Sequence, residues 1–231
     1  MSKRKKKPRK SIIRRKIADG VGTVVDAAQT SFEPHTSSHL PDVIYVDDLF
    51  NVGECEIIKN YSSEWESIEG RISSRVDSES GDKIESKKTD YRICTLYRPP
   101  ENLEQVDWIN EKLLSVITGV NRDYYQFDIK ALVEPPNLMK YEADKNGHYD
   151  YHLDIGQTKP NCWRKLSYTL FLNDGYEGGT LEFKTGQGII SYNGPVSRMV
   201  IFPSYLLHKV NPVTSGTRWA MVGWAHGASF R

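Results

Sequence analysis

Cysteine is scarce in this chain, and long apolar runs are missing. The three cysteines, Cys55, Cys94 and Cys162, are odd in number and have no paired spacing, which argues against a disulfide framework or a zinc knuckle and favours a reducing compartment. No stretch reaches the roughly 18 apolar residues that a membrane-spanning helix needs, and none has the character of a signal peptide. These absences predict a soluble protein of the cytoplasm without a membrane span.

Acidic residues are absent from residues 1–16, which hold ten of the 31 Lys and Arg of the chain. The net charge of +1 therefore hides a basic arm on a body with a charge of 21 minus 30, or −9. A block of like charges usually stays solvated, so we expect residues 1–40 to form a disordered tail. Residues 3–16 would also suit nucleic acid, a membrane surface or an acidic protein as a partner.

With 231 residues and 38% hydrophobic content, the chain can bury one core of ordinary size, and we expect a single domain over residues 41–231. Its first part combines two kinds of pattern. Strands are expected at residues 42–46, 69–76 and 89–97, and helices at residues 51–65 and 101–120. The second helix is amphipathic, because its apolar residues recur at helical spacing.

From Tyr124 onward the pattern changes to short runs rich in β-branched and aromatic residues. Turn signals such as Asn146-Gly147, Gly178-Gly179 and Asn193-Gly194 separate these runs. Many short strands at such intervals predict an antiparallel sandwich or barrel. The fold class is therefore α+β dominated by β, with helices in the N-terminal third.

The segment GHYDYHLD at residues 147–154 ends in a His-x-Asp pair, His152 and Asp154. Side chains two positions apart share one face of a strand, so this imidazole and carboxylate can meet at one metal ion. The same alternation predicts that the residues between, such as Tyr149, point the other way. By itself the pair is weak evidence, because an ordinary solvated strand face has the same pattern.

The downstream segment from His208 to Arg218 supplies the missing parts. An apolar strand breaks at Pro203 and re-forms around His208, and Arg218 opens a second apolar strand that would bury its guanidinium unless an anion met it. Two neutral imidazoles and one carboxylate on one face of a ferrous ion are the arrangement that non-haem oxygenases use. An arginine fork matches the far carboxylate of a dicarboxylate co-substrate.

Four sequence blocks, taken in order, resemble the iron(II)- and 2-oxoglutarate-dependent oxygenases of the prolyl 4-hydroxylase type, most closely the bacterial and phage hydroxylases. The blocks are residues 44–55, 141–154, 166–181 and 202–218. The likeness runs from about Ile44 to Trp224. It is specific for the superfamily and not for a substrate.

This resemblance implies a double-stranded β-helix, or jelly roll, with a metal-binding core at about residues 135–228 and supporting N-terminal helices. It assigns the side chains of His152, Asp154 and His208 to Fe(II). It assigns Arg218 to the distal carboxylate of 2-oxoglutarate.

Tyr141 matches a tyrosine that lies near the co-substrate in related enzymes, although a core tyrosine on a neighbouring strand explains it equally well. Thr169 and Trp224 could line the same pocket, and both have ordinary explanations as strand and core residues. His148 and Asp150 are interpreted as groups at the rim of the pocket and not as a second metal pair.

The activity implied by the resemblance is hydroxylation of an unactivated C–H bond with O2, releasing succinate and CO2, with ascorbate as a reductant. The leading substrate is a peptide or protein, with proline as the candidate residue. The alternatives are a free amino acid or other small molecule, or a nucleic-acid-associated role through the basic tail. Phosphate contacts of such a tail would give affinity without sequence information.

One departure from the family pattern lies just before the strand that leads to His208. The family commonly has a Gly-Asp or Gly-Asn turn there, whereas this chain has Val196-Ser197-Arg198. The departure leaves the turn geometry open and does not affect the ligands.

Overall fold

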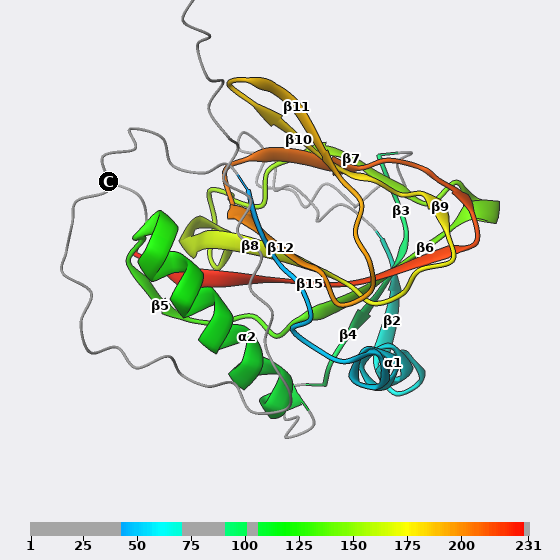
Figure 1. Ribbon diagram of the computed structural model, residues 1–231, viewed down its shortest axis with the longest axis horizontal. Coiled ribbons are helices and arrows are strands. Elements are labelled where there is room, and N and C mark those ends of the chain that lie inside the picture. Colours follow the sequence, from blue (N-terminus) through cyan, green and yellow to red (C-terminus); the bar gives the residue numbers. More distant parts are fainter. Residues whose placement is uncertain (1–42, 71–90, 101–105, 229–231) are drawn as a thin grey trace, which may run out of the picture.

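The computed structural model describes residues 43–70, 91–100 and 106–228. Within these residues two main β-sheets face each other, and two α-helices cover the outer side of the larger sheet (Figure 1). The predicted basic tail lies outside the described residues, as do parts of the expected strands and of the second helix, at 71–76, 89–90 and 101–105. Neither described helix is long and apolar enough to cross a membrane.

The larger sheet has the strand order β1-β12-β8-β15-β6-β4-β2, and β5 also pairs with β15. Its strands are β1 (Ile44–Val46), β2 (Glu66–Glu69), β4 (Thr95–Arg98), β5 (Ile129–Ala131), β6 (Asn137–Glu142), β8 (Arg164–Phe171), β12 (Met199–Pro203) and β15 (Thr217–Gly227). The long strand β15 lies at the centre, between β8 and β6 (Figure 1).

The smaller sheet has the order β11-β10-β13-β7-β3, and a separate two-stranded pair joins β14 to β9. These strands are β3 (Arg92–Ile93), β7 (His148–His152), β9 (Glu177–Gly178), β10 (Leu181–Thr185), β11 (Gly188–Tyr192), β13 (Leu207–Val210) and β14 (Val213–Ser215). All of the described pairings are antiparallel. The prediction of an α+β fold dominated by β is confirmed.

The space between the two sheets is filled by a hydrophobic cluster that both sheets supply. Phe171 and Phe202 contribute from the larger sheet, and Leu181, Phe183 and Val210 from the smaller one. Alternation along each strand explains this, because every second side chain points inward. Polar side chains at the same inward positions therefore face each other across the sandwich, which is where the candidate site forms.

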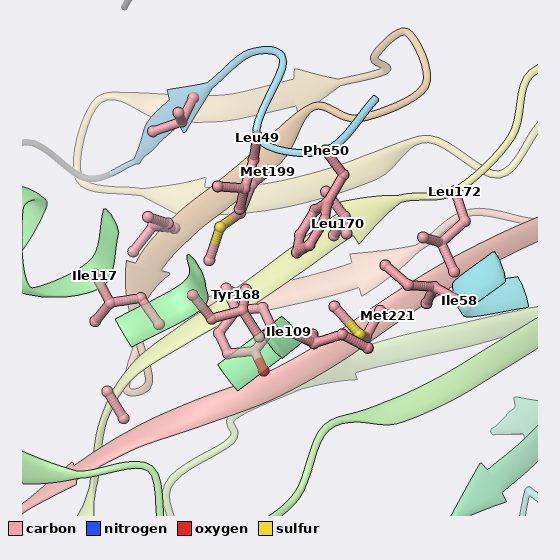
Figure 2. Packing of buried hydrophobic residues seen from close by; sticks show 14 of the residues in the cluster. Leu49, Phe50, Ile58, Ile109, Ile117, Tyr168, Leu170, Leu172, Met199 and Met221 are labelled. Carbon is pink, nitrogen blue, oxygen red and sulfur yellow. The ribbon is translucent and has the colours of Figure 1, made fainter. Parts of the chain in front are cut away.

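A second cluster lies on the other face of the larger sheet, under the helices α1 (Val52–Asn60) and α2 (Asp107–Val120). Figure 2 shows Ile109 and Ile117 of α2 and Ile58 of α1 near Tyr168 and Met221 of the sheet. All five are buried. Burying a side chain of this size contributes about 1.5–3 kcal/mol, so the helices brace the strands that carry the site.

The first helix begins where the sequence predicts, because Asn51 forms a complete capping box with Glu54. The Asn51 Oδ1 accepts from the Glu54 N–H, and a Glu54 carboxylate oxygen accepts from the Asn51 N–H, both at 2.9 Å. The helix ends at Asn60 and continues as a 3-10 turn at Tyr61–Ser63, short of the expected end near Trp65. The second helix, expected over residues 101–120, begins at Asp107 and ends at Val120, where the sequence predicts its end.

The turn that departs from the family pattern keeps a glycine-like backbone. Ser197 has a φ of +70°, the left-handed region that favours glycine. Its Oγ accepts a 2.9 Å hydrogen bond from the Phe50 N–H, and its own N–H donates to the carbonyl of Phe171 at 2.8 Å. The Ser197 hydroxyl satisfies the buried N–H of Phe50, and this hydrogen bond offsets the energetic cost of the left-handed backbone at Ser197.

Candidate metal and co-substrate site

Three potential metal ligands, His152, Asp154 and His208, converge on the inner side of the smaller sheet. His152 ends β7 and lies directly opposite His208 of β13 in the strand register, while Asp154 follows two residues after β7 ends. One ligand atom from each residue lies within 4.8 Å of the others. The sequence prediction named these three residues, and tertiary pairing brings them together.

The spacing of the three ligand atoms suits one ion after small movements. The His152 Nε2 is 3.7 Å from one Asp154 oxygen, and the His208 Nε2 is 3.6 Å from the other. Ligand atoms about 2.1 Å from a common ion lie roughly 3 Å apart, so side-chain shifts of less than about 1 Å close the site. The donor set, two imidazoles and a carboxylate on one side of an ion, fits a ferrous centre with open positions.

Both imidazoles present the correct nitrogen to such an ion. The Nδ1 of His152 lies 2.8 Å from the carbonyl oxygen of Asp150, and the Nδ1 of His208 lies 2.8 Å from that of Leu206. A carbonyl oxygen only accepts, so each neutral ring carries its proton on Nδ1 and keeps a lone pair on Nε2. The backbone therefore fixes the tautomer and the orientation of both rings before any ion arrives.

The charges of the site also match a divalent cation. Burial and the neighbouring His208 lower the pKa of His152 to about 3, so its imidazole is neutral near pH 7. Burial alone would raise the pKa of Asp154, but the two histidines and a hydrogen bond from Ser167 outweigh it and leave the pKa lowered. His152 thus offers a neutral nitrogen and Asp154 an ionised carboxylate to a cation.

Asp154 lies beyond the end of its strand and is held by contacts on several sides. Its N–H donates to the carbonyl of Ser204 at 3.0 Å, and its carbonyl accepts from the Arg164 Nη1 at 3.1 Å. The Ser167 hydroxyl, which bonds the carboxylate, is 3.0 Å from the Ser204 hydroxyl. The carboxylate is therefore oriented without help from a metal ion.

Arg164 is itself held by Glu134, which lies in the loop between β5 and β6. Its Nε donates to one Glu134 oxygen at 2.6 Å and its Nη2 donates to the other, while its Cζ lies 3.5 Å from the centre of the Trp224 ring. The His226 Nε2 meets the same carboxylate at 2.8 Å. The sequence prediction did not identify this frame, because no local motif links residues 30 or more positions apart.

A β-bulge in β7 changes the alternation that the sequence predicts. His208 pairs with His152, but Val210 pairs with Tyr149, so two residues of β7 lie opposite the single residue of β13 between these pairs. Tyr149 therefore turns inward and stacks on His152, with ring centres 3.5 Å apart and an angle of 14°. The prediction that Tyr149 points away from His152 was wrong for this reason.

Arg218 lies on β15 of the larger sheet and contacts Phe171, which belongs to the same hydrophobic cluster as Phe183 and Phe202, the two rings that pack against His208. It is only 1% exposed, and its Nε and Nη2 atoms have no hydrogen-bond partner among the described residues. Its guanidinium lies 5.3 Å from the ring centre of Tyr141 and 5.0 Å from that of Phe171. A buried cation with unsatisfied hydrogen-bond donors destabilises the fold unless an anion binds to it, as the sequence predicted for this strand.

Gly179 makes room for this guanidinium. It has a φ of +60°, and a Cβ atom there would come within 2.7 Å of the Arg218 Cδ. The Gly178-Gly179 turn of the sequence is therefore required by close approach as well as by backbone conformation. Tyr176 beside it has a raised pKa, because burial outweighs the stabilising effect of the Arg218 charge on its phenolate.

Tyr141 lies directly beside Arg218 in the strand register and is 2% exposed. Burial raises its pKa well above the ordinary value, so its hydroxyl stays protonated and can donate a hydrogen bond. Among the other expected pocket residues, Thr169 is buried in β8, whereas Asp150 is exposed and His148 is half-buried with its Nδ1 2.6 Å from the Asn146 carbonyl. Neither of the last two belongs to the metal cluster.

Comparisons with known proteins agree with this arrangement. The family model of the 2OG-Fe(II) oxygenase superfamily matches residues 136–226. A PKHD-type hydroxylase of Cupriavidus metallidurans is 31% identical over 172 residues, which is 71% of this chain and 68% of that protein. Matches to four further PKHD-type hydroxylases cover only 38–43% of those proteins.

Solved structures share the fold. A prolyl-4-hydroxylase of Pseudomonas putida aligns with a TM-score of 0.58 and 16% identity, covering 81% of this chain and 93% of that one. A prolyl hydroxylase of Trichoplax adhaerens, in complex with a hypoxia inducible factor peptide fragment, aligns with a TM-score of 0.59 and 16% identity over 80% of this chain and 84% of that one. The jelly-roll prediction is thereby confirmed. The chain belongs to the 2OG-Fe(II) oxygenase superfamily and is a hydroxylase-type enzyme related to the PKHD-type hydroxylases.

Proposed function

We propose that His152, Asp154 and His208 bind Fe(II) and that this site serves a 2-oxoglutarate-dependent hydroxylation. The observation that carries the proposal is the presence of two features beside the same hydrophobic cluster between the two sheets. The first is a His-Asp-His cluster whose Nε2 atoms are already oriented inward. The second is Arg218, which is buried with idle donors.

In this proposal Arg218 binds the distal carboxylate of 2-oxoglutarate through the two donors that lack partners. Tyr141 adds a hydroxyl donor beside Arg218. Its pairing with Arg218 across β6 and β15 supports this role. Buried carboxylate recognition by an arginine fork gives both affinity and a fixed orientation. The co-substrate would thereby be aimed from the larger sheet toward the metal ligands of the smaller one.

The bound iron and co-substrate supply the oxidation of a C–H bond by O2, with release of succinate and CO2. The chain itself holds and orients the participants. Stacking of Tyr149 on His152 and the hydrophobic residues between the sheets keep water from one side of the site. Ascorbate as a reductant is part of the same proposal.

The catalytic domain is proposed to extend over residues 41–231, with the metal-binding core at about 135–228. The family match at residues 136–226 supports this core. The proposed substrate is a peptidyl C–H bond, with proline as the candidate residue. The peptide complex of the Trichoplax protein and the prolyl-4-hydroxylase from Pseudomonas putida support that choice by likeness of fold.

Anaerobic addition of Fe(II) and 2-oxoglutarate tests the metal and co-substrate assignments. The wild-type protein should develop the weak visible charge-transfer band of the chelate. His152→Ala should lose the band, whereas His148→Ala, a change of the same kind on the same strand, should keep it. A wild-type spectrum without the band would refute the assignment.

Mass spectrometry for a gain of one oxygen tests the substrate. Peptides containing proline and a pool of free amino acids and small metabolites are incubated separately with Fe(II), 2-oxoglutarate and O2. Oxygen gain at proline in the peptide arm is the expected result. Oxygen gain restricted to the small-molecule arm would replace the peptidyl substrate by a small one.

A further inference from the structure

Arg92 is a second guanidinium near the candidate site whose contacts are unusually weak. It lies on β3, where it pairs with Tyr149 of β7. Its Nε donates to the Cys94 Sγ at 3.3 Å, and its Nη2 donates to the Met139 Sδ at 3.4 Å. Thiol and thioether sulfurs are poor acceptors, so the fork has no strong partner in the described part of the chain.

The other arginines that are largely removed from water show what this chain normally provides. Arg164 meets both oxygens of Glu134, and Arg198 meets both oxygens of Asp47 at 2.6 and 3.0 Å. The exception is Arg218, the proposed partner of the co-substrate carboxylate. Arg92 resembles Arg218 in this respect, because neither fork meets a carboxylate among the described residues.

The position of Arg92 connects it to the reacting region. Its Cζ lies 4.7 Å from the centre of the Tyr149 ring, and that ring stacks on His152. Met139, the second sulfur contact, lies on the inner face of β6 in the same hydrophobic cluster as Tyr141. Arg92 therefore lies between the edge of the smaller sheet and β6, one aromatic ring away from a proposed metal ligand.

The carboxylates of 2-oxoglutarate do not account for this second fork. In the proposed function Arg218 would bind the distal carboxylate, and the opposite end of the co-substrate would be directed toward His152, Asp154 and His208. A guanidinium is always charged and its planar fork matches a carboxylate with two parallel hydrogen bonds. Arg92 is thus available for an anion that neither the described residues nor the co-substrate supplies.

We propose that Arg92 binds a carboxylate of the substrate and so selects acidic molecules for hydroxylation. This inference rests on the proposed function and deepens it by naming a substrate class. The carboxylate belongs either to a free amino acid or other small organic acid, or to an acidic side chain of a peptide. The sulfur contacts hold the fork in place and are easily exchanged for carboxylate oxygens, because weak acceptors are displaced at small cost.

Equilibrium dialysis under anaerobic conditions tests the proposal with protein that carries Fe(II) and saturating 2-oxoglutarate. One arm contains N-acetyl derivatives of the common amino acids, each paired with its carboxamide. The other arm contains acetylated tetrapeptide amides with Asp at one position, each paired with its Asn counterpart. Retained probes are identified and quantified by mass spectrometry, together with 2-oxoglutarate.

Wild-type protein should retain carboxylate probes at least about tenfold more than their amide partners in one arm, and that arm identifies the source. Arg92→Gln should remove the preference without changing 2-oxoglutarate retention, and Arg92→Lys should restore part of it. Arg122→Gln makes the same change of charge at an exposed side chain and should behave as wild type.

Equal retention of acids and amides, retention of no probe, or an unchanged preference in Arg92→Gln would overturn the proposal. Loss of 2-oxoglutarate retention in Arg92→Gln would also overturn it, because Arg92 would then serve the co-substrate. Failure of the wild-type protein to retain 2-oxoglutarate would count against the proposed function instead. The two ideas are therefore separated by measurements in the same dialysis cell.

Discussion

Replacing Arg218 by methionine should stabilise the protein in the absence of 2-oxoglutarate and remove the stabilisation that 2-oxoglutarate gives. Two donors of this guanidinium are buried without partners, and each such donor costs about 1–3 kcal/mol. Its contacts with the rings of Tyr141 and Phe171 return about 1–2 kcal/mol in total. Methionine keeps much of the apolar volume, so the middle of these ranges predicts a rise of about 2.5 kcal/mol in the free energy of unfolding.

Thermal unfolding with and without ligand measures both effects. For a chain of this length each kcal/mol corresponds to about 2–4 °C in Tm, so the metal-loaded variant should melt a few degrees above wild type. With 2-oxoglutarate at 100 times its Kd, wild type should gain about 2.7 kcal/mol and the variant should gain nothing. The difference in Tm between the variant and wild type should then become smaller or change sign.

Arg198→Met is the matched control, because Arg198 already has a carboxylate partner. Removing it strands Asp47, so that variant should be destabilised with and without ligand, and its 2-oxoglutarate shift should persist. If Arg218→Met lowers the stability of the empty protein by more than about 1 kcal/mol, the unpartnered donors are not costly and the argument fails. A full 2-oxoglutarate shift in Arg218→Met would refute its role in binding.

Further predictions concern the residues around the site. Glu134→Gln should weaken the ion pair that holds Arg164, which should lower the free energy of unfolding by about 2 kcal/mol. Because Arg164 also bonds the Asp154 carbonyl, the variant should bind Co(II) more weakly at the proposed metal ligands. Unchanged Co(II) affinity would show that Glu134 and Arg164 do not position these ligands. Ser197→Gly relieves a left-handed φ worth about 1 kcal/mol but leaves the Phe50 N–H without its acceptor at about 1–3 kcal/mol, so urea unfolding should show a net loss; a gain in stability would mean that backbone strain dominates. The pKa of His152, lowered to about 3 by burial and by the neighbouring histidine, means that the unfolded chain binds a proton that the native metal-free protein does not. Its stability should therefore be complete above about pH 7 and fall between about pH 6.5 and 3, and a His152→Asn variant with the same slope would contradict this cause.

Local sequence signals were sufficient to locate the two helices and to name the proposed metal ligands. The cap at Asn51 and the apolar spacing of α2 are short-range properties, and they predict correctly where α1 begins and where α2 ends. His152, Asp154 and His208 could be named because their residue types and the flanking blocks limit the chemistry. The burial of Arg218 also followed from the apolar strand around it.

Only the tertiary structure decided how these residues are oriented and what supports them. The bulge in β7, which turns Tyr149 onto His152, depends on the register with β13 and not on the sequence of β7 alone. The pair of Arg164 with Glu134 and the contact of Arg92 with Met139 join residues 30 and 47 positions apart, which no local pattern reveals. The sequence by itself therefore determined which groups are available for chemistry, because residue type and spacing are local. Strand pairing decided which of them meet and which donors remain unpaired, because those properties arise only when distant strands pack together.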